Sequence, residues 1–247
     1  MRKILVIGIG AGDPDHLTVQ AVKALNTVDV FFVLDKGEVK QELVDLRQSI
    51  LDAHVTRQYR VLEGRDPERD RTASDYVGAV DDWRRRRADV CAELVSSLGP
   101  DEVGAFLVWG DPSLYDSTLP ILEDLLARGM AFEYSVIPGI TSVAALTAAH
   151  RVNLNRTGRP VQITTGRRLA SGWPSDVDDV AVMLDAHCAF ADVDPDVVVY
   201  WGAYLGMPDE TLISGRVGDV ADRIVATRAA LRAEKGWIMD TYLLRRS

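Results

Sequence analysis

The sequence predicts a two-domain α/β protein, with a mostly parallel sheet in the first half and a more mixed second half. Short apolar runs alternate with longer helical patterns, and a glycine-rich turn follows the first apolar run. From Val161 onward the apolar runs come closer together, with one clear amphipathic helix among them. Strands that alternate with helices are typical of a parallel sheet covered on both faces.

The first strand, Ile4 to Ile7, is apolar at successive positions, as expected for a strand buried on both faces. Residues 63–71 are polar and predict a loop, and Gly99-Pro100 ends a long helix. The expected strands of the first half are residues 4–7, 30–34, 59–61 and 103–108, and the expected helices are 17–25, 38–51 and 74–97.

In the second half, helical spacing predicts helices at residues 118–126, 141–149 and 220–231. Strands are expected at residues 132–137, 161–164, 180–184, 197–201 and 237–244. This change of pattern predicts an N-terminal domain over residues 1–115 and a C-terminal domain over residues 116–247, joined near Asp116.

Composition narrows the function. The 47% apolar and 26% charged content is that of a soluble globular protein, and no apolar run reaches the roughly 20 residues that cross a bilayer. A net charge of −9 disfavours nucleic acid and favours a small-molecule partner. Two cysteines give no disulfide framework, so a cytoplasmic protein is expected. The four histidines show no metal-ligand spacing, and we expect no metal.

Three segments after predicted strands carry candidate chemistry: residues 8–14, 110–115 and 138–142. The first is glycine-rich, but a dinucleotide fingerprint would need glycine at Asp13 or Asp15, and the Gly-Lys-Ser/Thr ending of a Walker loop is absent. Read separately, each segment has a simple structural explanation, such as a tight turn or a helix cap.

Together, the order Gly-x-Gly-x-Gly-Asp-Pro-x-x-Leu-Thr, then Gly-Asp-Pro, then Pro-Gly-Ile-Thr-Ser resembles the tetrapyrrole methylase family over almost the whole chain. The resemblance implies two α/β domains with S-adenosylmethionine in the cleft between them, a tetrapyrrole substrate, and usually a homodimer. Ala11 stands where most members have proline. The segments FLVWGDPSLYDSTLPILE and EKGWIMDTYLLRR resemble one subgroup, which methylates ring carbon 1 and releases an acetyl group as acetate.

The resemblance also implies roles for single residues. Gly10 and Gly12 would lie on the substrate side, together with Asp13. Acetate release needs a base; Asp13 ranks first, followed by Asp35 and Tyr115, each of which could equally be a cap or turn residue. For Met183 and Leu184 the alternative is ordinary strand packing. The implied cofactor contacts are Gly110, Asp111, Leu114, Thr141, Ser142, Met183 or Leu184, and Gly202.

A tetrapyrrole with many carboxylates calls for basic side chains, and the candidates are Arg156, Arg159, Arg167 and Arg168. The run from Arg84 to Arg87 points all around a helix, so most of it should face solvent. Competing interpretations are a diphthamide or ribosomal-RNA methylase of the same fold, a nicotinamide-dependent oxidoreductase, and a non-catalytic sensor of tetrapyrrole or S-adenosylmethionine.

Overall fold

The computed structural model describes residues 1–35, 41–68 and 76–246, and its internal contacts separate two compact units. Unit 1 comprises residues 1–10 and 14–140; unit 2 comprises residues 11–13 and 141 onward. The expected division after Tyr115 falls inside unit 1, because β5 (Glu133–Ile137) pairs with β1 (Lys3–Gly8) in the first sheet.

Unit 1 is built on a five-stranded sheet in the order β3-β2-β4-β1-β5, and every described pairing in it is parallel. The mostly parallel first half predicted from the sequence is therefore confirmed. Besides β1 and β5, its elements are a 3₁₀ helix (Pro14–His16), α1 (Val19–Leu25), β2 (Val30–Asp35), α2 (Gln41–His54), β3 (Arg60–Arg65), α3 (Tyr76–Ser96), β4 (Val103–Val108) and α4 (Thr118–Ala127).

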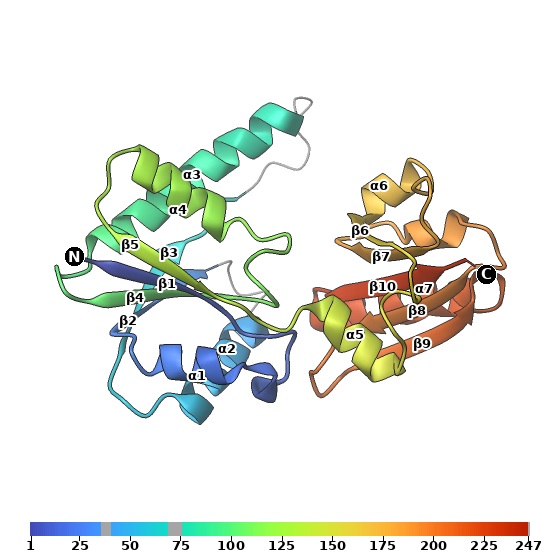
Figure 1. Cartoon of the computed structure of the whole chain (residues 1–247), viewed down its shortest axis with the longest axis horizontal. Helices are drawn as coiled ribbons and strands as arrows, with labels where there is room; N and C mark the ends of the chain where they lie inside the picture. The colour runs from blue at the N-terminus through green and yellow to red at the C-terminus, as the bar shows by residue number, and fades with distance from the viewer. Residues whose placement is uncertain (36–40, 69–75, 247) are drawn as a thin grey trace. The chain divides into compact units, whose positions relative to one another are not determined.

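Each face of this sheet has its own apolar core. Alternate residues of β1 point to opposite faces, so Ile4 and Val6 join one cluster while Leu5 and Ile7 join the other. The first cluster includes Leu94 of α3 and residues of α4, and the second includes residues of α1 and α2. Figure 1 shows α3 and α4 on one face and α1 and α2 on the other. Burial of β1 on both faces was predicted from its unbroken apolar run.

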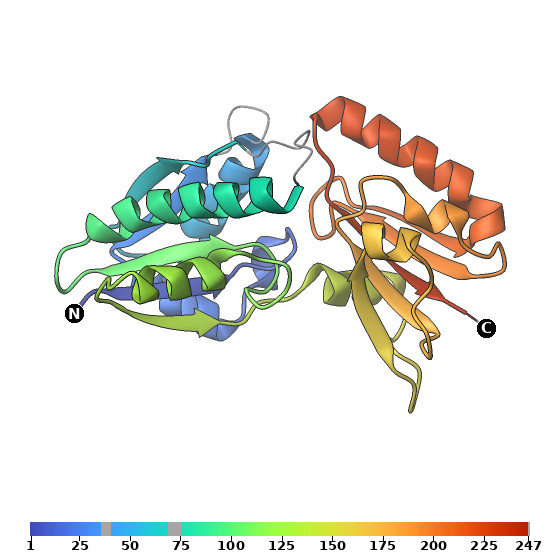
Figure 2. The same ribbon diagram turned by 90° about the horizontal axis from the view of Figure 1, so that it is seen from above.

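Unit 2 holds a five-stranded sheet in the order β6-β7-β10-β8-β9. Only β6 and β7 are parallel; the other pairings are antiparallel, which matches the mixed second half predicted. Helices α5 and α7 lie on opposite faces of this sheet (Figures 1 and 2). The elements are α5 (Ser142–His150), β6 (Val161–Thr165), α6 (Gly166–Ala170), β7 (Asp179–Met183), a 3₁₀ helix (Ala189–Asp192), β8 (Val198–Ala203), β9 (Thr211–Arg216), α7 (Val217–Lys235) and β10 (Asp240–Arg245).

The structure differs from the predicted elements in a few places. Strand β3 continues through residues 63–65, where polarity predicted a loop, because its backbone pairs with β2 at the sheet edge while most of its side chains are exposed. Strand β9 and helix α6 were not predicted, and β10 begins at Asp240 rather than Trp237. The predicted start of the second helix at residue 38 lies outside the described residues.

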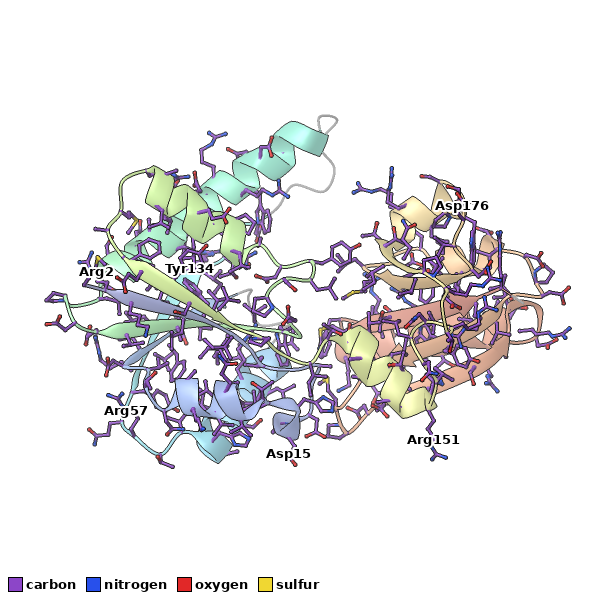
Figure 3. The ribbon with its side chains drawn as sticks, viewed as in Figure 1. Arg2, Asp15, Arg57, Tyr134, Arg151 and Asp176 are labelled. Carbon is purple, nitrogen blue, oxygen red and sulfur yellow. The ribbon has the colours of Figure 1, made fainter. Side chains whose placement is uncertain are left out.

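Local contacts explain several element ends. Thr18 caps α1 by accepting a hydrogen bond from the Ala21 amide at 3.0 Å. Arg151 ends α5 in the left-handed conformation (φ 57°), with its side chain directed away from unit 2 (Figure 3). Arg57 pairs with Asp29 at 2.5 Å on the surface of unit 1. Within the described ranges, no helix combines the length and apolar content that crossing a bilayer requires.

Candidate functional site

Three glycine-containing segments meet at the carboxyl edge of the first sheet. Strand β1 lies between β4 and β5, so their parallel carboxyl ends are neighbours. Gly10 and Gly110 form a backbone bridge, in which the Gly110 amide donates to the Gly10 carbonyl at 2.8 Å. A Cβ on Gly8 would lie 2.6 Å from the Gly139 nitrogen, and one on Gly139 would overlap the Gly110 carbonyl oxygen. Glycine is required here because backbone fills the space of a side chain. We call Gly8, Gly10, Gly110 and Gly139 the glycine cluster.

Asp111 ties two of these segments together. One carboxylate oxygen accepts the Gly139 amide at 2.9 Å; the other accepts the Ser113 amide at 2.9 Å and the Ser113 hydroxyl. Partial burial raises the pKa of Asp111, but the hydrogen bonds from Ser113 and Gly139 outweigh it and leave the pKa below its usual value. The carboxylate therefore stays charged and holds the turn after β4 against the turn after β5.

The remaining unit 1 candidates follow β4 or end β2. Leu114 is half-buried and closes a turn by donating its amide to the Asp111 carbonyl at 3.1 Å. Tyr115 has a left-handed backbone (φ 54°) and is 47% exposed. Burial raises the pKa of its phenol, so at neutral pH Tyr115 can donate a proton in a hydrogen bond but cannot act as an anionic base. Asp35 ends β2, and its side chain lies outside what the structure describes.

Residues 11–13, which directly follow the glycine cluster, group with unit 2. Gly12 is buried there: a Cβ on it would lie 2.6 Å from both the Leu205 carbonyl oxygen and the Met207 side chain. Asp13 is half-buried. The close approach of the loop after β8 therefore explains why position 12 must be glycine, and it fixes the backbone that carries Asp13.

Thr141 is the N-cap of α5 and Ser142 is its first residue. The two hydroxyl groups differ in their hydrogen bonding. The Thr141 hydroxyl accepts the Ala144 amide at 3.1 Å and so caps the helix, which is the simpler of the two roles considered for it. The Ser142 Oγ is buried, and no described residue forms a hydrogen bond with it. A buried hydroxyl without a partner is uncommon in a folded protein. Ser142 is therefore the better of the two as a ligand contact.

Met183 and Leu184 lie where β7 ends. Met183 is half-buried, whereas Leu184 has a left-handed backbone (φ 54°) and is 67% exposed. A left-handed backbone at a residue with a large side chain is uncommon, and it can mark a functional turn. The alternative of ordinary strand packing fits Met183 better than Leu184.

Asp185 fixes this turn, and the sequence analysis did not single it out. Its buried carboxylate accepts the His187 amide at 2.9 Å, the Ala189 amide at 2.7 Å and the Tyr242 hydroxyl at 2.6 Å. A Cβ on Gly166 would overlap the Asp185 side chain. The sequence signal for Asp185 was an acidic residue just after a buried strand. Its partner Tyr242 lies in β10, which is far away in the sequence although it is paired with β7 in the sheet.

Gly202 lies in β8, and its open side is filled by leucines. A Cβ there would lie 2.7 Å from Leu205, 2.8 Å from Leu146 and 3.2 Å from Leu212. The missing side chain thus allows α5 and the turn after β8 to pack closely on the sheet. A contact between Gly202 and a ligand would have to come from its backbone.

The four candidate arginine clamps separate into two pairs. Arg156 lies 3.4 Å from the Asp179 carboxylate and 3.5 Å from that of Asp178, and Arg159 lies 3.9 Å from Asp178. Arg156 is therefore paired with carboxylates at the start of β7, whereas Arg159 is 65% exposed and makes only a long contact there. Arg167 and Arg168 are exposed on α6, which follows Thr165, the residue in register with Met183. This second pair lies at the same sheet edge as Met183 and Leu184.

The run of four arginines on α3 was predicted to face mostly solvent, and this is confirmed. The side chains of Arg84, Arg85 and Arg86 are 62%, 66% and 47% exposed. Arg87 is the exception: it is 13% exposed and lies 3.2 Å from Asp66. Within the part of the chain that the structure describes, no group of three or more histidine, cysteine or acidic residues is arranged to hold a metal ion.

Comparison with known proteins gives one consistent answer. The model of the tetrapyrrole (corrin/porphyrin) methylases matches residues 3–221. The chain is 54% identical to the precorrin-6A synthase (deacetylating) of Sinorhizobium sp, over 100% of this chain and 96% of that protein. It is 23% identical to the uroporphyrinogen-III C-methyltransferase of Priestia megaterium, over 90% of this chain and 91% of that protein.

Solved structures agree with these sequence relatives. A cobalamin synthesis related protein, CobF, from Corynebacterium diphtheriae has a TM-score of 0.84 and 40% identity, covering 99% of this chain and 98% of that chain. The uroporphyrin-III C-methyltransferase of Thermus thermophilus in complex with S-adenosyl homocysteine has a TM-score of 0.60 and 19% identity, covering 99% and 97% of the two chains, and shows the shared fold. The chain belongs to the tetrapyrrole (corrin/porphyrin) methylase family.

Proposed function

We propose that this protein is an S-adenosylmethionine-dependent methyltransferase of cobalamin biosynthesis that converts precorrin-5 to precorrin-6A. It methylates ring carbon 1 of the substrate and releases an acetyl group as acetate. The observation that carries the proposal is the 54% identity to the Sinorhizobium enzyme over the full length of the chain. The net charge of −9 disfavours the RNA substrates of other enzymes with this fold.

The residues present fit S-adenosylmethionine. In unit 2, the buried Ser142 hydroxyl forms no hydrogen bond with a described residue, and Leu184 has an exposed apolar side chain on a turn fixed by Asp185. In unit 1, the glycine cluster lets the turns after β1, β4 and β5 pack backbone against backbone, and Asp111 holds two of these turns together. The Thermus relative that was crystallised with S-adenosyl homocysteine has the same fold, which supports this choice of cofactor.

The sulfonium of S-adenosylmethionine carries an electrophilic methyl group. Methyl transfer therefore needs little acid–base catalysis by the protein. Its residues need only align the ring carbon with the methyl group and exclude water. Acetate release asks more, because water must lose a proton as it attacks the acetyl carbonyl. We assign that base to Asp13: it is half-buried on a segment fixed by the packing of Gly12, whereas Tyr115 stays protonated at neutral pH.

The decisive experiment is mass spectrometry of the purified protein incubated with precorrin-5 and methyl-labelled S-adenosylmethionine. The proposal expects one labelled methyl group per product and an equivalent amount of acetate. Methyl gain without acetate would instead identify a tetrapyrrole methylase that acts at another carbon. Cofactor binding without any transfer would overturn the proposal and direct attention to diphthamide and RNA substrates, and then to a sensor.

Two further properties belong to the proposal. The enzyme is expected to act in the cytoplasm and as a homodimer, as is usual in the family. Light scattering coupled to size-exclusion chromatography tests the second point, since a single chain has a mass of 27.2 kDa. A peak at the monomer mass across micromolar concentrations would contradict the dimer.

A further inference from the structure

An arginine of unit 1 forms no salt bridge with a described residue. Arg47 lies on α2, with its guanidinium carbon 5.1 Å from the centroid of the Trp109 ring. Its hydrogen bond is a long one, 3.5 Å, to the Leu43 carbonyl one turn earlier in the same helix. No carboxylate among the described residues comes within ion-pair distance of it. A guanidinium has five N–H donors, and the described residues occupy one of them.

The neighbouring Arg87, unlike Arg47, has polar side-chain partners among the described residues. It lies 3.2 Å from the Asp66 carboxylate and donates to the Ser117 hydroxyl at 2.7 Å. Burial and the charge of Arg87 lower the pKa of Arg47 to about 10, although Asp116 opposes them. Among the described residues no carboxylate pairs with this half-buried cation, and a bound anion would supply such a partner.

Trp109 provides a second donor without a partner. It directly follows β4 and precedes Gly110 of the glycine cluster. Its indole N–H is buried, and no described residue accepts a hydrogen bond from it. Leaving a buried donor unsatisfied costs free energy that a ligand acceptor would recover. The guanidinium of Arg47 and the indole N–H of Trp109 therefore both have hydrogen-bond donors that no described residue uses. The two side chains are in contact at the carboxyl edge of the first sheet.

We propose that Arg47 and the Trp109 indole N–H form an anion subsite that takes a peripheral carboxylate of the tetrapyrrole substrate, an assignment that rests on the proposed function. The carboxylate would accept hydrogen bonds from both donors. S-adenosylmethionine fits less well, because its sulfonium and ammonium outnumber its one carboxylate and give it a net positive charge. A polycarboxylate suits an uncompensated arginine, and a planar guanidinium matches carboxylate geometry.

Steady-state kinetics with both substrates varied tests the subsite. Arg47→Gln is expected to raise the KM for precorrin-5 by roughly ten- to a hundred-fold, the range for a charged hydrogen bond, and to leave the KM for S-adenosylmethionine within about twofold. Arg47→Lys should recover part of the loss, and Trp109→Phe should give a smaller rise. Arg84→Gln is the matched control, because Arg84 is 62% exposed and 3.7 Å from Asp81, and it should behave as wild type.

An unchanged KM for precorrin-5 in Arg47→Gln would overturn the subsite, as would an equal rise in both KM values together with a lower melting temperature. Fluorescence titration with uroporphyrin, a polycarboxylate porphyrin, separates this failure from failure of the proposed function. If wild type does not turn over precorrin-5 but Arg47→Gln still weakens uroporphyrin binding, the function is wrong and the subsite stands. Equal uroporphyrin affinity in the two proteins would reject the subsite.

Discussion

At the scale of single residues, each unit carries some candidate side chains that stabilise its fold and others that do not. Asp111 uses both carboxylate oxygens to hold neighbouring turns, and Thr141 caps a helix. Arg47, the Ser142 hydroxyl and Leu184 gain little from their surroundings in the free protein. The second group marks positions where ligand contacts would compensate for an unfavourable arrangement.

Replacing Asp111 by alanine tests the first group. We expect the free energy of unfolding to fall by about 1–3 kcal/mol, because the Gly139 and Ser113 amides lose their acceptor. We also expect binding of S-adenosylmethionine to be lost, because the turns that would hold it loosen. Denaturant unfolding and calorimetric titration measure the two effects. Unchanged cofactor affinity would refute the assignment of Asp111 to the cofactor site.

The same residue predicts a pH dependence. The folded-state pKa of Asp111 lies below its ordinary value of 3.8, so its charge stabilises the fold above that value. The contribution disappears as the pH falls through the folded-state pKa. The difference in unfolding free energy between wild type and Asp111→Asn should therefore shrink as the pH is lowered below 3.8. A difference that stays constant down to acid unfolding would contradict this.

Arg47 predicts an effect of opposite sign. Burial and the charge of Arg87 lower its pKa in the folded protein to about 10, so the charged side chain destabilises the fold at every pH below about 10. That destabilisation fades as the pH rises above about 10 toward the ordinary pKa of arginine. Arg47→Met should raise the free energy of unfolding at pH 8 by about 1 kcal/mol while it weakens substrate binding.

Arg57→Met is the control for this prediction, because Arg57, labelled in Figure 3, forms an ion pair with Asp29 at 2.5 Å. Chemical denaturation of the three proteins under the same conditions gives the comparison. A less stable Arg47→Met would mean that the arginine is structural.

At the scale of elements, strand ends rather than strand interiors determine the site. Glycine-rich turns after β1 and β4 were recognisable in the sequence because glycine and aspartate follow unbroken apolar runs. Strand β9 (Thr211–Arg216) was not, because most of its side chains are exposed or only partly buried and the sequence shows no unbroken apolar run there. Asp185 and Arg47 were also not identified from the sequence. Their environment depends on contacts with Tyr242 and Trp109, which lie far away in the sequence.

Gly139→Ala tests the glycine cluster. The added Cβ would overlap the Gly110 carbonyl oxygen, which is backbone and cannot rotate away. We expect a loss of about 1–3 kcal/mol or more in unfolding free energy, together with weaker cofactor binding. Gly99→Ala is the control, because its Cβ would meet only the Glu102 side chain at 3.5 Å. Equal stability of the two variants in urea would show that the cluster has no steric requirement.

Tyr242→Phe tests the turn after β7. The buried Tyr242 hydroxyl donates to Asp185 at 2.6 Å, and burial followed by the charge of Asp185 raises its pKa far above the usual range, so it stays protonated. We expect the variant to lose about 1–3 kcal/mol of stability and to show a several-fold higher KM for S-adenosylmethionine.

Trp173→Phe removes one hydrogen bond to the Val177 carbonyl, at 2.7 Å, elsewhere in unit 2. It should lose stability without a change in that KM. Parallel kinetics in both variants would mean that Asp185 does not position Leu184.

At the scale of the whole molecule, neighbouring residues of the loop after β1 belong to different units. Gly10 bridges to Gly110 in unit 1, whereas residues 11–13 group with unit 2. The sequence pattern alone placed the division near Asp116, between a first half in which strands alternate with helices and a more mixed second half. Contacts place it near Thr141, because sheet pairing of β5 outweighs the local pattern. Family resemblance supplied the fold, and packing of Gly12 against Leu205 supplies the reason that this loop is fixed.

The position of Asp13 on that fixed loop yields the final prediction. If Asp13 takes the proton from the attacking water, Asp13→Asn should slow acetate release by about a hundred-fold or more, the range for a lost general base. Affinity for S-adenosylmethionine should stay within about twofold, because no cofactor contact is removed. Asp15→Asn is the control, since Asp15 is exposed in the adjacent 3₁₀ helix (Figure 3), and it should release acetate as wild type does. Acetate assay and calorimetric titration give both readouts. Wild-type acetate release from Asp13→Asn would leave Asp13 as a loop residue and move the search for the base to Asp35.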